Sequence, residues 1–268
     1  MSSNFQELAA FLQDGHAIIL VQISKTEGST PRNNDAYLLV TPNEIAGTIG
    51  GGQLEFHAID IARNMIATSE AFRQLDMALG PHLGQCCGGK VSLNFISVTP
   101  EISRELLKKA EKAAYLLPMI AIFGAGHTGK ALCHQLTLLP FAVSLIDDRH
   151  IALSAIGANV TQLHSSDPEE FITATPDIAV VIVLTHSHSL DYAITAAALK
   201  RDDIAYVGMI GSATKRTLFS RWFLQSGGTN TQLDKLKCPI GGAEIVDKRP
   251  EIIAALTIAE IIRVLSLA

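Results

Sequence analysis

Cysteine, charge and long apolar runs are all scarce in this sequence, and each shortage excludes a class of protein. Four cysteines in 268 residues do not suggest a disulfide scaffold. Charged residues make up only 18% of the chain, and a net charge of −5 argues against nucleic acid or an anionic membrane surface as the main partner. The longest apolar run, residues 178–184, is far shorter than the roughly 20 residues of a membrane-spanning helix, and the N-terminus lacks the basic region of a secretory signal. We therefore expect a reduced, cytoplasmic protein that binds neither nucleic acid nor membrane.

The chain is nevertheless rich enough in apolar residues, at 48%, to build sizeable cores, and its length of 268 residues predicts about two domains. From residue 118 onward, apolar strands alternate with helical runs, which is typical of a parallel sheet covered on both faces. The fold class is therefore α/β: an N-terminal α/β domain over residues 1–117, then a Rossmann-like doubly wound parallel-sheet domain over residues 118–268. A final helix over residues 250–267 should bury a stripe made of Ile252, Ile253, Leu256, Ile261 and Ile262.

The strongest motif lies at the start of the second domain. It reads Gly124-x-Gly126-x-x-Gly129 and lies between a short apolar strand and a helical run, and a second apolar strand then ends at Asp147. This is the dinucleotide-binding fingerprint, in which Gly124 allows a tight turn, Gly126 lets the backbone approach a pyrophosphate and Gly129 lets helix and strand pack closely. Asp147 stands where a ribose-binding carboxylate belongs, so NAD should bind better than a 2′-phosphorylated dinucleotide. The alternative is a Rossmann-like half that has lost its nucleotide and keeps the glycines for packing.

A run of three glycines, Gly50, Gly51 and Gly52, stands between a predicted strand and a predicted helix. Successive backbone N–H groups in such a run can face one anion, so we interpret it as a cradle for a phosphate or an oxyanion. Arg32 in the neighbouring polar loop would assist. The alternative is a tight turn that needs positive φ angles.

Two adjacent cysteines, Cys86 and Cys87, occupy a glycine-rich loop. Adjacent cysteines cannot both chelate one zinc in the common C-x-x-C manner, so a structural zinc site is not expected. Vicinal thiols can instead ligate a soft metal, carry a persulfide or change redox state. The alternative is that both are buried as small hydrophobic residues. We interpret Cys133 and Cys238 as structural.

Polar residues follow the most apolar strand of the second domain. His186, His188 and Asp191 lie where ligands of open α/β sheets bind, at the carboxyl end of a strand. We interpret them as lining a pocket, with metal ligation and helix capping as the alternatives.

Ser212 precedes a predicted helix that carries Lys215 and Arg216 in its first turn. Cations are disfavoured beside the positive end of a helix, so an anionic ligand there would offset the cost. The alternative is a solvated pair of cations.

Taken together, these segments resemble the XdhC family, the accessory factors of xanthine dehydrogenase and related molybdenum hydroxylases. Many relatives follow the triple glycine with Cys, whereas this chain has Gln53, which leaves Cys86 and Cys87 as the better thiol candidates. The motifs that carry the resemblance run in order along nearly the whole chain, at residues 28–32, 47–55, 83–89, 123–129, 147–149, 185–188, 207–212, 215–216 and 239–241.

The resemblance implies a chaperone, rather than a catalyst, that binds molybdenum cofactor (molybdopterin). Such a protein supports sulfuration of the cofactor with a cysteine desulfurase and inserts it into xanthine dehydrogenase or a related hydroxylase, and a homodimer is expected. Cys86 and Cys87 would then meet the metal, and the Rossmann half would bind either part of the cofactor or a separate nucleotide such as NAD. The rivals are an NAD-dependent oxidoreductase that uses His186 or His188 as acid/base, and a nucleotide-sensing module without chemistry.

Overall fold

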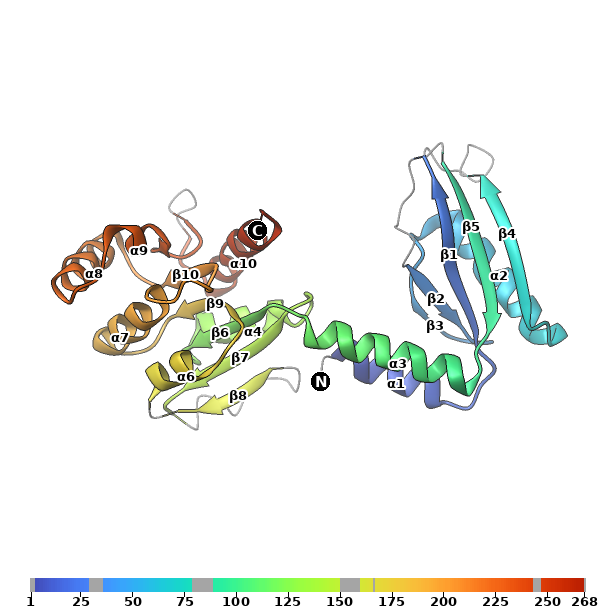
Figure 1. Cartoon of the computed structure of the whole chain (residues 1–268), viewed down its shortest axis with the longest axis horizontal. Coiled ribbons are helices and arrows are strands. Elements are labelled where there is room, and N and C mark those ends of the chain that lie inside the picture. Colours follow the sequence, from blue (N-terminus) through green and yellow to red (C-terminus); the bar gives the residue numbers. More distant parts are fainter. Residues whose placement is uncertain are drawn as a thin grey trace. The chain divides into compact units, whose positions relative to one another are not determined.

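The structure is a computed structural model that describes residues 3–28, 36–78, 89–149, 160–165, 167–242 and 247–267. It divides into two compact units, Met1–Ala113 and Ala114–Ala268, which are described separately below (Figure 1).

The first unit is built on an antiparallel sheet, which has five strands among the described residues, in the order β3-β2-β1-β5-β4. Every neighbouring pair in this sheet is antiparallel. The strands are β1 (Ile19–Glu27), β2 (Tyr37–Val40), β3 (Ile45–Gly47), β4 (Phe72–Ala78) and β5 (Lys90–Ser97). The helices are α1 (Ser3–Gln13), α2 (Gly52–Thr68) and α3 (Pro100–Tyr115).

Both faces of this sheet carry apolar side chains, because successive residues of a strand point to opposite faces. Val21 on one face belongs to a buried cluster with Leu54 of α2. Leu20 on the other face belongs to a second cluster with Leu8 of α1 and Leu106 of α3. The sheet is therefore sandwiched between helices, with α2 on one side and α1 and α3 on the other (Figure 1).

The second unit is a parallel sheet, with six strands among the described residues, in the order β11-β10-β9-β6-β7-β8. Its strands are β6 (Met119–Phe123), β7 (Ala142–Asp147), β8 (Thr161–His164), β9 (Ile178–Val183), β10 (Tyr206–Met209) and β11 (Leu236–Lys237). Its helices are α4 (His127–Leu136), α6 (Pro168–Ala174), α7 (His188–Leu199), α8 (Ala213–Gln225), α9 (Asn230–Asp234) and α10 (Pro250–Leu267).

The strand order is that of the doubly wound fold. The chain starts in the middle at β6, moves outward through β7 and β8, then returns to pair β9 with the other edge of β6. The order reverses between β6 and β9, and ligands of such sheets bind outside the carboxyl ends of the strands at this switch point. The Rossmann-like parallel-sheet domain expected from the sequence is confirmed.

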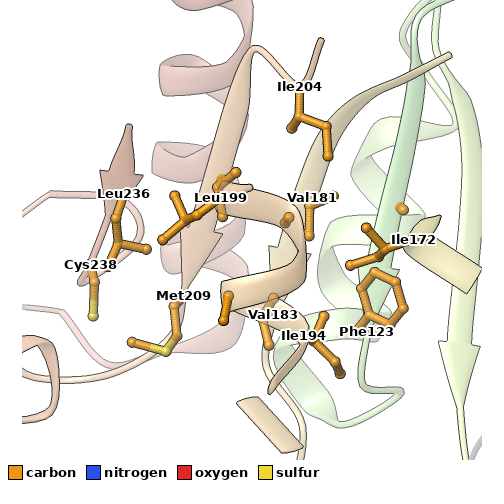
Figure 2. Packing of buried hydrophobic residues seen from close by; sticks show 14 of the residues in the cluster. Phe123, Ile172, Val181, Val183, Ile194, Leu199, Ile204, Met209, Leu236 and Cys238 are labelled. Carbon is orange, nitrogen blue, oxygen red and sulfur yellow. The ribbon is translucent and has the colours of Figure 1, made fainter. Parts of the chain in front are cut away.

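Helices cover both faces of the parallel sheet. Figure 2 shows Phe123 and Val183 packed with Ile172 of α6 and Ile194 of α7 on one face. On the other face, α4 and α10 form the second cluster, to which Leu132 and other apolar residues contribute. Both faces of the sheet are therefore shielded from solvent, which explains why strands such as β9 are almost continuously apolar.

Helix α10 has the bounds that the sequence predicts, but its buried face is rotated from the predicted stripe. Ile261 is fully buried as expected, whereas Ile262 is 40% exposed. Ala254, Thr257 and Ile258 complete the buried face. No helix in the described parts of the chain is long and apolar enough to cross a membrane.

Candidate functional site

The glycine loop after β6 is held tightly between neighbouring backbone segments. The Gly124 N–H donates to the carbonyl of Ile146 at 2.8 Å, and the Leu184 N–H donates to the carbonyl of Phe123 at 2.8 Å. Gly124 has a φ of 117°, and a Cβ there would overlap the Leu184 carbonyl. A Cβ at Gly129 would overlap the Gly124 carbonyl. The first and third glycines are therefore required by the packing of the loop itself.

Gly126 differs from the other two glycines, because none of the described residues would obstruct a side chain there. Its φ is −72°, and no described heavy atom lies within 4 Å of the place a Cβ would take. It is also the N-cap residue of α4, and in the described part of the chain no side chain caps that helix, whereas Ser187 caps α7 and Ser212 caps α8. The loop thus offers open space and uncapped helix N–H groups at the position where the fingerprint backbone meets a pyrophosphate.

Asp147, the last residue of β7, is buried and fully engaged by hydrogen bonds. Only 2% of its side chain is exposed. Its Oδ1 accepts from the backbone N–H of Arg149 at 2.9 Å and from Arg149 Nε at 2.8 Å. Its Oδ2 accepts from the Ala125 N–H at 2.6 Å and from Arg149 Nη2 at 2.9 Å. The carboxylate therefore ties the end of β7 to the glycine loop.

These bonds keep Asp147 ionised. Burial alone would raise the pKa of the carboxyl, but the Arg149 guanidinium and the backbone N–H groups of Ala125 and Arg149 outweigh burial and hold that pKa well below its ordinary value. The predicted contact of Asp147 with a ribose stays a prediction.

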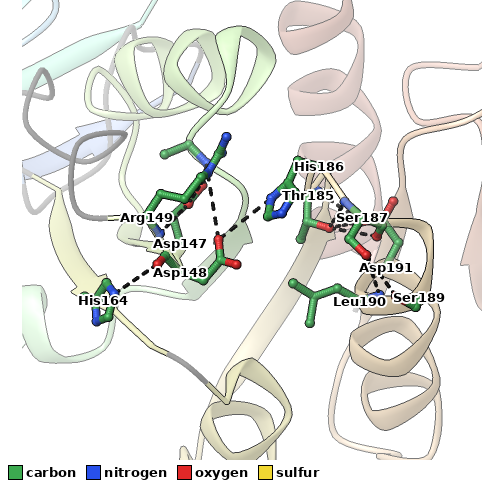
Figure 3. Close-up of polar contacts among 11 residues, drawn as sticks. Asp147, Asp148, Arg149, His164, Thr185, His186, Ser187, Ser189, Leu190 and Asp191 are labelled. Carbon is green, nitrogen blue, oxygen red and sulfur yellow. Dashed lines mark hydrogen bonds and ion pairs between the residues drawn. The ribbon is translucent and has the colours of Figure 1, made fainter.

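Asp148 and His186 form the exposed rim of the switch point. Asp148 follows β7 and His186 follows β9, and β6, which leads into the glycine loop, lies between those strands in the sheet. Figure 3 shows the side chains of Asp148 and His186 pointing toward each other. Asp148 Oδ1 lies 3.8 Å from His186 Nδ1 and 3.8 Å from Arg149 Nε. The side chains of Asp148 and His186 are 36% and 49% exposed. Charged and titratable groups therefore stand directly beside the open loop.

A buried ion pair joins α7 and α8 at the same edge of the sheet. The Asp191 carboxylate accepts from the Thr185 N–H at 2.9 Å and from the Thr185 hydroxyl at 2.7 Å, and it pairs with Lys215 Nζ. Lys215 also donates to the carbonyl of Ile210 at 2.9 Å. Asp191 is thus the anion that offsets the Lys215 charge at the start of α8.

The remaining predicted residues near α7 and α8 lie as follows. Ser212 caps α8, and its hydroxyl accepts from the Lys215 N–H at 3.3 Å. The exposed Arg216 donates to the carbonyl of Cys238 at 3.3 Å. His188 is exposed at the first position of α7. Within the described ranges, no group of three or more His, Cys, Asp or Glu side chains could hold a metal ion.

The triple-glycine turn of the first unit already contains a carboxylate. Gly50, Gly51 and Gly52 all have positive φ angles, of 126°, 75° and 65°. Glu55 of α2 turns back into the loop, where its Oε2 accepts from the Ile49 N–H at 3.0 Å, from the Gly51 N–H at 3.2 Å and from the Thr48 hydroxyl. The geometry favours a tight turn satisfied from within, and an anion from outside would have to displace Glu55.

The three strands that precede the N-terminal motif segments, β1, β3 and β4, run in the same direction. Glu27 at the end of β1 and Ala78 at the end of β4 both pair with Lys90 at the start of β5. Gly47 at the end of β3 pairs with Leu38 near the start of β2. The motif segments at residues 28–32, 47–55 and 83–89 therefore follow strands whose carboxyl ends lie at the same edge of the sheet.

Arg32, Cys86 and Cys87 lie outside the described residues, and their predicted roles stay predictions. The other two cysteines are buried. Burial raises the pKa of Cys133 to about 12, and burial also raises the pKa of Cys238. Both thiols are therefore protonated at neutral pH, as structural cysteines are.

Three residues with central contacts in the glycine loop and the triple-glycine turn were not among the predicted site residues: Asp148, Arg149 and Glu55. Asp148 and Arg149 follow the predicted acid, and the signal that could have found them is a cation two residues beyond an acid at a strand end. Glu55 stands three residues beyond the triple glycine, where a first-turn acid can reach the loop N–H groups.

Comparison with known proteins adds the family. A family model described as the XdhC Rossmann domain matches residues 120–261, and one described as the XdhC and CoxI family matches residues 11–76. The chain is 28% identical over 275 residues to the uncharacterized protein YqeB of Escherichia coli (strain K12). That alignment covers 97% of this chain but 46% of the relative, so the chain spans about half the length of that protein.

One solved structure is similar over the whole chain. It is a crystal structure described as a xanthine dehydrogenase from Bacillus halodurans, with a TM-score of 0.79 and 18% identity over 100% of this chain and 96% of that one. At this identity the likeness shows a shared fold.

Proposed function

The chain belongs to the XdhC family, and from that membership we propose that it is an accessory factor for xanthine dehydrogenase or a related molybdenum hydroxylase. It binds molybdenum cofactor as cargo, supports the sulfuration of that cofactor and inserts it into the target enzyme. The family models match residues in both units, so the proposal assigns a role to each.

The observation that carries the proposal is the opening at Gly126. The chain itself does not need a glycine there, since no described atom lies within 4 Å of a Cβ at that position. The uncapped start of α4 stands beside this opening. A phosphate group, whether from the pterin cofactor or from a nucleotide, fits a place that combines space with helix N–H donors that no described side chain caps.

The first unit supplies the sulfur and metal contacts in this proposal. Cys86 and Cys87 offer soft thiolate donors to molybdenum or carry sulfur, and Arg32 contacts the cofactor's phosphate. The common direction of the flanking strand ends supports this assignment. For the triple glycine to bind an anion, Glu55 must leave the turn, since its carboxylate now accepts from the N–H groups of Ile49 and Gly51.

The proposal implies three partners. These are the apoenzyme of the hydroxylase, a cysteine desulfurase that donates sulfur, and a second copy of the chain. We place the protein in the cytoplasm, where thiols stay reduced.

The second candidate is a nicotinamide-dependent oxidoreductase, and one observation favours it. His186 lies 3.8 Å from the Asp148 carboxylate at the switch point, where a bound dinucleotide would meet an acid/base residue. The same dinucleotide site without turnover would make the chain a nucleotide sensor.

The contents of the purified chain distinguish the candidates. Protein isolated from cells that make molybdenum cofactor should carry molybdenum and a fluorescent pterin, and Gly126→Ala should reduce both. Turnover of a reduced nicotinamide by metal-free, pterin-free protein would instead favour the oxidoreductase.

A further inference from the structure

The hydrogen bonds of Asp147 leave it little capacity to bind a ribose. A carboxylate offers about four lone-pair sites, and Asp147 already accepts four hydrogen bonds from Ala125 and Arg149. A ribose diol could bond to this carboxylate only by displacing the guanidinium or the N–H of the glycine loop. Loss of the Ala125 N–H bond would leave a buried donor unpaired, and loss of the guanidinium would break the ion pair that keeps the buried Asp147 carboxylate compensated.

Asp148, the next residue, has the free acceptor sites for a ribose hydroxyl that Asp147 lacks. No described residue donates a hydrogen bond to the Asp148 carboxylate, whose neighbours are His186 Nδ1 and Arg149 Nε, each at 3.8 Å. Its side chain is 36% exposed, against 2% for Asp147. It stands at the end of β7, beside the glycine loop and facing the residue that follows β9 (Figure 3).

We propose that Asp148, and not Asp147, accepts the hydrogen bonds from the ribose hydroxyls of a nucleotide bound at the glycine loop. Asp147 is a positioning residue that fixes Arg149 and the first peptide of the loop. This inference rests on the part of the proposed function that gives the Rossmann half a phosphate-bearing ligand, and it names that ligand as a nucleotide with a free 2′-hydroxyl.

The net negative charge at the end of β7 favours a nucleotide whose ribose carries a 2′-hydroxyl over one that carries a 2′-phosphate. Two carboxylates and one guanidinium meet there, and Arg149 is already paired with Asp147 and lies 3.8 Å from Asp148. The local balance is therefore one negative charge. A 2′-phosphate would be repelled by Asp148, whereas a 2′-hydroxyl can donate a hydrogen bond to it.

The test compares NAD and NADP binding to the full chain and to two matched variants. NAD should bind roughly tenfold tighter than NADP, or more, since like charges facing each other are strongly disfavoured. Asp148→Asn should weaken NAD and bring the two dissociation constants close together. Asp147→Asn, which changes the adjacent carboxyl in the same way, should weaken both dinucleotides by a similar factor and keep their ratio.

Three results would overturn the inference. They are a ratio that is unchanged in Asp148→Asn, a ratio that changes with Asp147→Asn instead, or no binding of either dinucleotide to the unmodified chain. Thermal unfolding of each variant shows whether it is folded, and a ratio of affinities is insensitive to partial loss of active protein. Activation of a molybdenum hydroxylase is measured separately, so failure of the ribose assignment and failure of the proposed function give different results.

Discussion

At the scale of single residues, two glycines of one loop should respond in opposite ways to the same substitution. Gly126→Ala places a methyl group in open space at a φ of −72°, so the free energy of unfolding should change by less than about 1 kcal/mol. Gly129→Ala drives a methyl group into the Gly124 carbonyl and should cost about 2 kcal/mol or more. Denaturant titration of both variants, alongside binding of a phosphate-bearing ligand, tests this.

Loss of ligand binding in the stable Gly126→Ala variant would identify the open space as a binding position. A Gly126→Ala variant that binds as well as the unmodified chain would make the loop purely structural. Equal stability of the two variants would contradict the packing described for Gly129.

Asp147 should make stability depend on pH in the acid range. Its pKa in the folded chain lies below that in the unfolded chain, so its contribution is fully present above the ordinary carboxyl pKa and is lost as the pH falls through the folded value. Asp147→Asn removes charge-assisted bonds to Arg149 and Ala125 and should cost about 2 kcal/mol at neutral pH.

The measurement is the difference in unfolding free energy between the unmodified chain and Asp147→Asn from pH 7 downward. The difference should shrink as the pH falls below the ordinary carboxyl range. A difference that stays constant with pH would show that the carboxylate gains nothing from its partners on folding.

At the scale of elements, the start of α2 should depend on Glu55. Removing its side chain leaves the N–H groups of Ile49 and Gly51 without their acceptor, so Glu55→Ala should cost about 1–3 kcal/mol. Asp60, on the exposed side of the same helix, gives the matched control, and Asp60→Ala should change stability far less. Equal effects of the two substitutions would show that the turn does not need the carboxylate.

The same variant tests the anion-cradle interpretation of the triple glycine. If the freed N–H groups can hold an outside anion, inorganic phosphate should restore stability to Glu55→Ala and have no such effect on the unmodified chain. No recovery at millimolar phosphate would leave the three glycines as a turn.

Elements with strong local patterns could be predicted from the sequence, and elements set by neighbours could not. The strand before the glycine loop and the final helix have the predicted bounds because both are strongly apolar. Strand β4 was not predicted, because it lies at the edge of its sheet, is largely exposed and interrupts its apolar residues with Arg73, Gln74 and Asp76.

The candidate site likewise combines features that the local sequence predicts with features that depend on distant residues. The glycine loop and Asp147, the acid at the end of β7, could be located from spacing alone. The pairing of Asp191 with Lys215 joins residues 24 positions apart, and the return of Glu55 into the turn depends on the helix start, so neither follows from a local pattern. The proposal for Asp148 depends on the four hydrogen bonds that Asp147 accepts from Arg149 and Ala125, and side-chain hydrogen bonds of this kind cannot be inferred from the sequence.

At the scale of the whole molecule, the two units have different tasks under the proposed function. The second unit would bind a phosphate-bearing group at the switch point, and the first would supply thiols and a cation to the molybdenum of the cofactor. Family models match residues in both units, which is expected if the two tasks serve one cargo. A chain with only one of the two units should therefore bind the cofactor less tightly than the whole.

The accessory role can be measured by reconstitution of a molybdenum hydroxylase. A hydroxylase apoenzyme that lacks sulfurated cofactor is incubated with molybdenum cofactor, a cysteine desulfurase and cysteine, with and without this chain, and its activity is followed over time. Activation should be faster and more complete with the chain, and this gain should be lost when Cys86 and Cys87 are both changed to Ser. Equal activation with and without the chain would contradict the account.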